Sequence, residues 1–200
     1  MSRCALVAFF ALTAVVAAHP RAAAGDAREA MRQELSRRFQ PSQIEIQDPA
    51  REGMVKRQGR LLILAGDRAP AKPFRVVEAG RTHTVREHLM DFARIDIGEG
   101  GGVRAEPGPL TVPRGTRLVV LDVKLAGDSV RLLTHTAEPL GTQPDGDLVY
   151  GCTEFVFHFE PGMLASGAVE PIVGAIERWL EGALALRTCR EGVKEICLEP

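Results

Sequence analysis

Residues 116–136 read TRLVVLDVKLAGDSVRLLTHT, two runs of alternating side chains that flank a Gly-Asp pair. Successive side chains of an extended strand point to opposite faces, so the first run has two distinct faces. The pattern places Leu118, Val120 and Asp122 on one face and Val119, Leu121, Val123 and Leu125 on the other. Gly127 and Asp128 suit a short turn between antiparallel strands. The stretch therefore predicts a β-hairpin.

A third strand and a helix are expected after this hairpin. Residues 150–159 carry Phe155, Phe157 and Phe159 at alternating positions, which predicts an aromatic face turned toward a core. Residues 167–187 have a wide apolar stripe at helical spacing, which predicts an amphipathic helix packed on that face. The expected fold is α+β: a small antiparallel twisted sheet or an SH3-like β-barrel, packed by this C-terminal amphipathic helix, with an N-terminal helix.

The sequence of this unit also resembles a known type of module. The stretches that carry the resemblance are VPRGTRLVVLDVKLAGDSVRLLT at 112–134 and TEFVFHFEPGML at 153–164, followed by the terminal helix. Over residues 112–187 the chain is similar to a module of uncharacterised exported bacterial proteins. The resemblance implies a β-hairpin, strand and helix unit, and it brings no catalytic residue with it.

The N-terminal half contains a helix and several short strands. Met31, Leu35 and Phe39 recur at every fourth position of residues 26–39, which predicts a helix with one apolar stripe. Residues 44–46 and 60–64 are candidate strands, and residues 74–78 and 85–96 are candidate strands or short helices. Two prolines argue against a central strand at residues 69–73, because proline has no N–H for a sheet ladder.

Glycine and proline break the chain in its middle. Residues 98–111 read GEGGGVRAEPGPLT, which predicts a linker or long loop. The expected organisation is a signal peptide at 1–24, an N-terminal helix with a β-rich segment at 25–97, this linker at 98–111, and the hairpin, strand and helix unit at 112–200.

The amino terminus has the parts of an export signal. Arg3 precedes an apolar run at residues 5–18, which is shorter than the roughly 20 residues needed to span a bilayer. Ala22 and Ala24 supply the small residues that signal peptidases read. Cleavage is expected after Ala24, or alternatively after Ala18, and no transmembrane anchor is expected afterwards. The residue usage, with arginine preferred to lysine and no asparagine, indicates a GC-rich bacterial genome and a periplasmic or secreted protein.

Charge and motifs restrict the function. The chain has 25 basic and 26 acidic side chains, a net charge of −1 that becomes −3 without residues 1–24, so a nucleic-acid partner is not expected. No catalytic residue and no cofactor is assigned. The expected function is a non-enzymatic binding or interaction module for a protein or ligand of the bacterial envelope. The alternatives are an enzyme or metal-binding protein with a site assembled from distant segments, and a structural or assembly subunit; the oligomeric state stays open.

Three polar side chains are the candidates for such an assembled site: His135, Glu154 and His158. Glu154 and His158 share a strand face with Cys152, but at about 3.3 Å per residue Cys152 and His158 lie roughly 20 Å apart. Metal ligands lie within about 2.3 Å of the ion, so no metal is assigned. The tripeptide at 127–129 matches the block of GDS-type hydrolases, but no Asp-x-x-His block follows, and turn chemistry accounts for it better.

Three cysteines follow the export signal. Cys189 and Cys197 flank seven residues, and a disulfide between them would stabilise by about 2.5 kcal/mol on the chain-entropy model. A longer ring closed by Cys152 would contribute about 4 kcal/mol on the same model. We expect Cys189–Cys197 to be the bridge, with Cys152 a buried free thiol or the alternative partner.

A peptide map of the unreduced protein tests this pairing. We expect one cross-linked peptide pair that contains Cys189 and Cys197, and alkylation of Cys152 only after denaturation. Cys152 in a cross-linked peptide would overturn the assignment.

Overall fold

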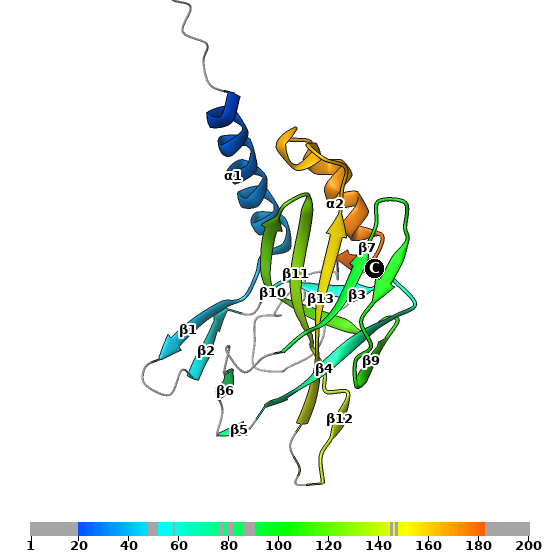
Figure 1. The fold of residues 1–200 in the computed structure, drawn as a ribbon. Coiled ribbons are helices and arrows are strands. Elements are labelled where there is room, and N and C mark those ends of the chain that lie inside the picture. The colour runs from blue at the N-terminus through cyan, green and yellow to red at the C-terminus, as the bar shows by residue number, and fades with distance from the viewer. Residues whose placement is uncertain are drawn as a thin grey trace, which may run out of the picture.

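The computed structural model describes residues 20–47, 52–57, 59–76, 78–79, 82–85, 91–144, 146 and 148–182. Within them, ten strands form a strongly curled half-barrel sheet and four others form a smaller sheet. In Figure 1 the long strands β10, β11 and β13 run side by side through the middle, and α1 and α2 lie toward one end of them. The predicted signal segment 1–19 and the cysteines at 189 and 197 lie outside the described residues.

The helices are α1 (Pro20–Phe39), α2 (Val169–Glu177) and a short 3-10 helix, η2 (Met163–Ala165). The larger sheet has the path β14 (Leu180–Gly182), β3 (Leu61–Leu64), β10 (Arg117–Ala126), β11 (Ser129–Thr136), β13 (Leu148–His158), β4 (Arg68–Val76) and β9 (Leu110–Pro113). Three more strands join it beside this path: β7 (Ala93–Ile97), β8 (Val103–Ala105) and β12 (Gly141–Thr142). The smaller sheet has the order β1 (Gln43–Gln47), β2 (Glu52–Arg57), β6 (Thr82–Val85) and β5 (Glu78–Ala79).

The predicted hairpin is confirmed as β10 and β11, but its two faces differ from the expected pattern. Gly127 has a φ of 58°, the left-handed conformation that a hairpin turn with glycine first requires. The register skips Leu121, because Val120 pairs with Thr134 and Asp122 pairs with Leu133. This β-bulge reverses the alternation, so that Leu118, Val120 and Val123 all belong to one core. The prediction that Val123 lies opposite to Val120 was wrong for this reason.

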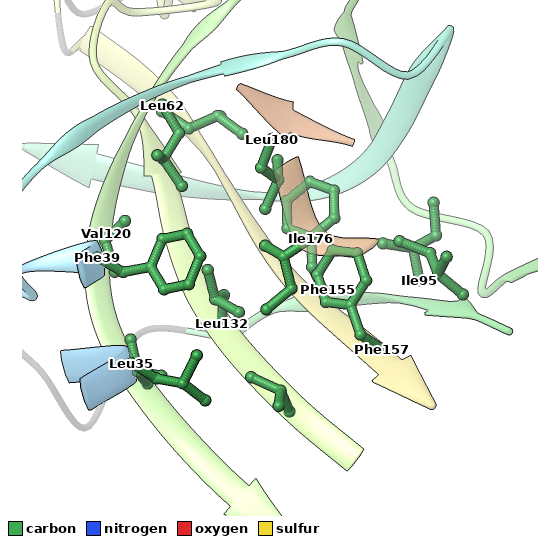
Figure 2. Close-up of a cluster of buried hydrophobic side chains, with 14 of the residues drawn as sticks. Leu35, Phe39, Leu62, Ile95, Val120, Leu132, Phe155, Phe157, Ile176 and Leu180 are labelled. Carbon is green, nitrogen blue, oxygen red and sulfur yellow. The ribbon is translucent and has the colours of Figure 1, made fainter. Parts of the chain in front are cut away.

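The aromatic face of the third strand is confirmed. Phe155 and Phe157 of β13 are buried, and so is Phe159 just after it. Figure 2 shows part of the core, in which Phe155 and Phe157 lie with Ile176 of α2. The core therefore lies on the inner side of the curled sheet, beneath both helices.

The strand β4 corrects the expectation that prolines exclude a central strand at residues 69–73. It runs through Pro70 and Pro73 and lies between β13 and β9 in the strand order. Residues 68–71 pair with β9, whereas residues 72–76 pair with β13. Each proline therefore has one partner strand only and an unpaired side, which is where a residue without an N–H is tolerated.

The glycine-rich stretch 98–111 contains strands where a linker or long loop was expected. β8 pairs with β7 in an antiparallel hairpin, and its turn is closed by a hydrogen bond from Gly98 N to Gly102 O. β9 begins at Leu110 within the same stretch. β7, which precedes this stretch in the chain, and β13, which follows it, pair with each other in the larger sheet. β8 has only three residues, all exposed, so it lacks the alternation by which a strand is recognised.

The N-terminal helix is confirmed, with Met31, Leu35 and Phe39 buried on its inner face. The helix ends where Gln40 takes a φ of 42° and Pro41 follows, since proline cannot continue a helix. Arg28 Nη2 donates to Gly127 O across 2.9 Å, which fastens the helix to the β10–β11 turn.

The C-terminal helix packs on the core as expected, but it is shorter than residues 167–187. α2 ends at Glu177, and β14 pairs with β3 immediately afterwards. Ala65 N donates to Trp179 O, so the chain leaving the helix is bound to the end of β3. Leu180 is buried in β14, and it would also be buried if the helix continued. Apolar spacing alone therefore placed the C-terminal end of the helix too late in the chain. Residues 183–187 lie outside the described residues.

The mixed α+β class with two α-helices is therefore as predicted, while the sheet is larger than expected. Among the described strands it has ten members, and β7 pairs with β13 in parallel. A small antiparallel sheet was thus the wrong expectation, and the SH3-like barrel is not confirmed.

Substitution of Gly59 tests how tightly the bulge is packed. A Cβ at this position would lie 2.1 Å from Val120 O and 2.8 Å from Ser42 N, both backbone atoms. We expect Gly59→Ala to lower the free energy of unfolding by about 1 to 3 kcal/mol, the range for overpacking. Urea denaturation measures the change.

The matched control is Gly174→Ala in α2, where a Cβ meets nothing within 4 Å. An alanine in a helix interior is expected to raise the free energy of unfolding by about 0.5 to 1 kcal/mol. Equal effects of the two substitutions would contradict the packing described here.

Candidate functional site

The face of the larger sheet that points away from the core carries most of the chemistry of the described residues. We call this the outer face. It is formed by alternate side chains of β7, β13, β11 and β10, which face opposite to Phe155 and Phe157. Its members include Arg94, Asp96, Asp122, Lys124, Ser129, Arg131, Leu133, His135, Tyr150, Cys152, Glu154, Val156 and His158.

Asp96 is the centre of one ion-pair group on the outer face. Arg94 donates to it through both Nε and Nη2, at 2.9 and 2.6 Å. His158 Nε2 lies 2.6 Å from Asp96 Oδ1. The hydrogen bond from Arg94, together with that from His158, lowers the pKa of Asp96 to about 2. Asp96 is therefore ionised throughout the ordinary pH range, and its charge is shared by two donors.

Glu154 is the second carboxylate of the outer face. Arg131 Nη1 lies 3.4 Å from Glu154 Oε1, and Arg94 on the opposite neighbouring strand is within electrostatic reach of the same carboxylate. Glu154 therefore lies between Arg94 and Arg131, and Asp96 lies between Arg94 and the imidazole of His158. This arrangement holds the charged groups in place and provides no free carboxylate for acid–base work.

The candidate residues His135, Glu154 and His158 share the outer face but do not meet. His135 is opposite Cys152 in the register, two positions from Glu154 and six from His158. Glu154 is bound by Arg131 and His158 by Asp96. Among the described residues, no three His, Cys, Asp or Glu side chains are grouped so that they could hold a metal ion.

His135 has a structural environment of its own. Its Nδ1 lies 2.7 Å from Thr136 O, and because a carbonyl only accepts, this nitrogen carries the proton. The ring stands edge-on to Tyr150, with 6.1 Å between the ring centroids. Burial lowers the pKa of His135, while the bond to Thr136 opposes the shift. The neutral imidazole is thus favoured at this position.

Cys152 is buried and forms no disulfide within the described part of the chain. It packs with Phe74, Phe92 and Tyr150 in a small apolar cluster on the outer face. Burial, with a smaller contribution from the charge of Asp91, raises the pKa of Cys152 to about 12. The thiol is therefore protonated and unreactive as a nucleophile. The bridge between the cysteines at 189 and 197 stays a prediction, because both lie outside the described residues.

The topology also brings a serine, a histidine and an aspartate to neighbouring positions. Ser129, from the Gly-Asp-Ser block, pairs directly with His158, which contacts Asp96. The hydroxyl of Ser129, however, donates to Ala126 O at 2.6 Å and is 5% exposed. A hydrolytic serine must be accessible and bound to the base that takes its proton. The side chain of Ser129 closes the hairpin turn instead.

Sequence reasoning missed Asp96, Arg94 and Arg131 as members of this face. Asp96 and Arg94 reach it because β7 adds to β13 in parallel across more than 50 residues of chain. The available signal was the alternation of residues 93–97, in which Arg94 and Asp96 interrupt three apolar positions.

Comparison with protein-family models, with curated proteins and with solved structures found no match to this chain. The interpretation of the outer face therefore depends on its own residues and geometry. In the described part of the chain, no helix has both the length and the apolar character to cross a membrane.

Removal of the Asp96 carboxylate tests the ion-pair group. The pKa of Asp96 is about 2 in the folded chain against 3.8 as its ordinary value, so the group stabilises the fold above about pH 4. This contribution is lost as the pH falls toward 2. We expect Asp96→Asn to reduce the free energy of unfolding by about 1 to 2 kcal/mol at pH 7, allowing for partial solvent screening. Urea denaturation between pH 7 and pH 2 measures it.

The difference between the wild type and Asp96→Asn is expected to shrink as the pH falls below about 4, and most of it is lost by pH 2. Asp67→Asn, at an exposed bend, is the matched control and is expected to leave the free energy of unfolding at pH 7 nearly unchanged. A difference that stays constant from pH 7 to pH 2 would exclude an electrostatic origin.

Proposed function

We propose that this protein is an exported, non-enzymatic binding module that engages a partner of the bacterial envelope through the outer face of its larger sheet. The observation that carries the proposal is the fixed arrangement of charges around Asp96 and Glu154. Three neighbouring strands, β7, β13 and β11, hold these groups at defined spacings, and the pairs limit the rotamers that each side chain takes. Charges fixed in this way favour recognition of a partner with complementary charges.

The chemistry of the same face supports a binding role over a catalytic one. The thiol of Cys152 is protonated, the hydroxyl of Ser129 is bound to Ala126 O, and Asp96 and Glu154 are both paired with cations. Each candidate nucleophile or base of the outer face thus has a structural role. An apolar cluster with Phe74 and Cys152 adjoins the charged groups, so the face combines charged and aromatic surface.

Export is part of this proposal and is supported by the sequence of residues 1–24. The mature chain would begin within α1 (Pro20–Phe39), which would lose its first five residues, and the first buried core residue of the helix is Met31. Removal of residues 1–24 therefore leaves the apolar face of α1 intact.

Photocrosslinking in cells that make the protein tests the proposed surface. A photoreactive benzoylphenylalanine replaces Lys124, whose side chain is exposed beside Arg131 on the outer face. We expect a discrete crosslinked species, and we expect it to disappear when Arg131→Glu is added to the same chain. Gel mobility and mass spectrometry identify the adduct.

The control position is Arg37 on the exposed side of α1. It is expected to give no matching adduct. The same adduct from both positions, or an adduct from position 37 alone, would contradict the proposed surface. A stable homo-oligomer assembled through another face, measured by light scattering, would favour the assembly-subunit alternative.

A further inference from the structure

We propose that a signal peptidase hydrolyses the peptide bond between Ala24 and Gly25, and that Asp26 then becomes the N-cap of a shortened α1. This inference rests on the export part of the proposed function. It assigns one processing site where the sequence leaves two open, after Ala24 or after Ala18. The hydrolysis consumes one water and leaves a carboxylate on Ala24 and an amino group on Gly25.

The contacts of α1 with the rest of the fold begin well inside the helix. Among its described side chains, the first that bonds to another element is Arg28, whose Nη2 donates to Gly127 O in the β10–β11 turn. Gly25 and Asp26 are exposed, and a Cβ at Gly25 would meet nothing within 4 Å. In Figure 1 the start of α1 extends past the β10–β11 turn. The fold therefore holds α1 only from the residues that follow Asp26.

The sequence of α1 suits a helix that begins just after Asp26. In the longer helix the first turn contains Arg21 and no acidic residue, although the positive end of the helix dipole favours an acid there. Aspartate is a weak helix former in the interior but one of the best N-cap residues. Glu29 follows Asp26 by three positions, which is the spacing of a capping box.

Cleavage after Ala24 frees backbone donors that the carboxylate of Asp26 can satisfy. Each helical N–H donates to the carbonyl four residues earlier, so Ala27 and Arg28 donate to the carbonyls of residues 23 and 24 in the longer helix. The hydrolysis removes both carbonyls. As N-cap, Asp26 accepts from the N–H of Arg28 or Glu29. Cleavage after Ala18 removes no carbonyl of α1, which begins at Pro20, and leaves Asp26 in the helix interior.

The bond between Ala24 and Gly25 is also accessible to a peptidase. Signal peptidases read small residues at the positions of Ala22 and Ala24. The end of a helix that lies before its first packed residue opens at a lower free energy than its packed middle. Because Met31 is the first buried residue of α1, opening residues 20–25 leaves the core in place.

Intact mass and N-terminal sequencing of the exported protein test the processing site. The full chain is produced in a bacterium and recovered from the periplasm or the medium. We expect a chain that begins at Gly25. Ala24→Leu places a large residue directly before the bond and is expected to abolish this product. Ala23→Leu is the matched control, because the middle position of the signal is not read, and it is expected to leave the product unchanged.

Thermal unfolding of the exported product tests the cap. We expect Asp26→Ala to lower the melting temperature by about 2 to 4 °C, the shift for loss of an N-cap in a chain of this length. Asp26→Asn retains a capping side chain and is expected to leave the melting temperature nearly unchanged. Inside a longer helix, alanine would raise the melting temperature instead, because it is the better helix former. Mass spectrometry verifies that each variant begins at Gly25.

Two results would overturn the proposal: an exported chain that begins at His19, or a melting temperature of Asp26→Ala equal to or above that of the wild type. The failure of the proposed function is distinguishable from these. A chain that keeps Met1 and stays in the cytoplasm refutes export itself. Loss of photocrosslinking from a chain that begins at Gly25 refutes the partner surface and leaves the processing site in place.

Discussion

The β-bulge at Leu121 is the constraint on which the rest of the structure depends. By inserting one residue into β10, it turns Val123 toward the same core as Val120. The residue just before the bulge, Val120, bonds on the edge of β10 opposite to β11, where its N–H donates to Arg60 O and its carbonyl accepts from Ser42. Ser42 donates to that carbonyl with both its backbone N–H and its hydroxyl, at 2.9 and 3.0 Å. The segment that follows α1 is thereby attached to the bulge. Gly59 fits beside it because it has no side chain, and its N–H donates to Ser42 Oγ.

A second constraint follows from the way two strands share one edge of β13. β4 pairs with β13 as far as Lys72 and Cys152, and β7 takes over from Thr153 onward. β7 then enters in parallel, which an antiparallel meander would not produce. This exchange places Arg94 and Asp96 beside the second half of β13. The apolar part of the outer face therefore lies where β4 pairs with β13, and the charged part lies where β7 pairs with β13.

Local pattern predicted the elements that are defined by their own side chains, and it did not predict those defined by distant partners. The β10–β11 hairpin, the aromatic face of β13 and the buried stripe of α1 each have a periodicity visible within about ten residues. Three other strands have no such periodicity. Prolines interrupt β4, β8 is short and exposed, and β14 carries a buried leucine that would suit a helix equally well.

The candidate site was also only partly predictable from local pattern. The sequence named His135, Glu154 and His158 as candidates, and the structure places them apart, His135 on β11 and the other two on β13. Their actual partners, Arg131 and Asp96, come from strands whose pairing no local pattern specifies.

The energetics of the ion pairs bear on why the outer face has this composition. Pairs exposed to this degree contribute about 0 to 1 kcal/mol each, which is small beside the burial of one phenylalanine of the core at about 1.5 to 3 kcal/mol. Stability alone therefore gives little reason for Arg94, Asp96, Arg131 and Glu154 to be held together. What the pairs do provide is position: Glu154 lies between Arg131 and Arg94 of its two neighbouring strands, and Asp96 accepts hydrogen bonds from Arg94 on its own strand and from His158 on β13. A charged group that is already fixed in place binds a partner without first losing side-chain freedom, which is the property that the proposed binding role requires.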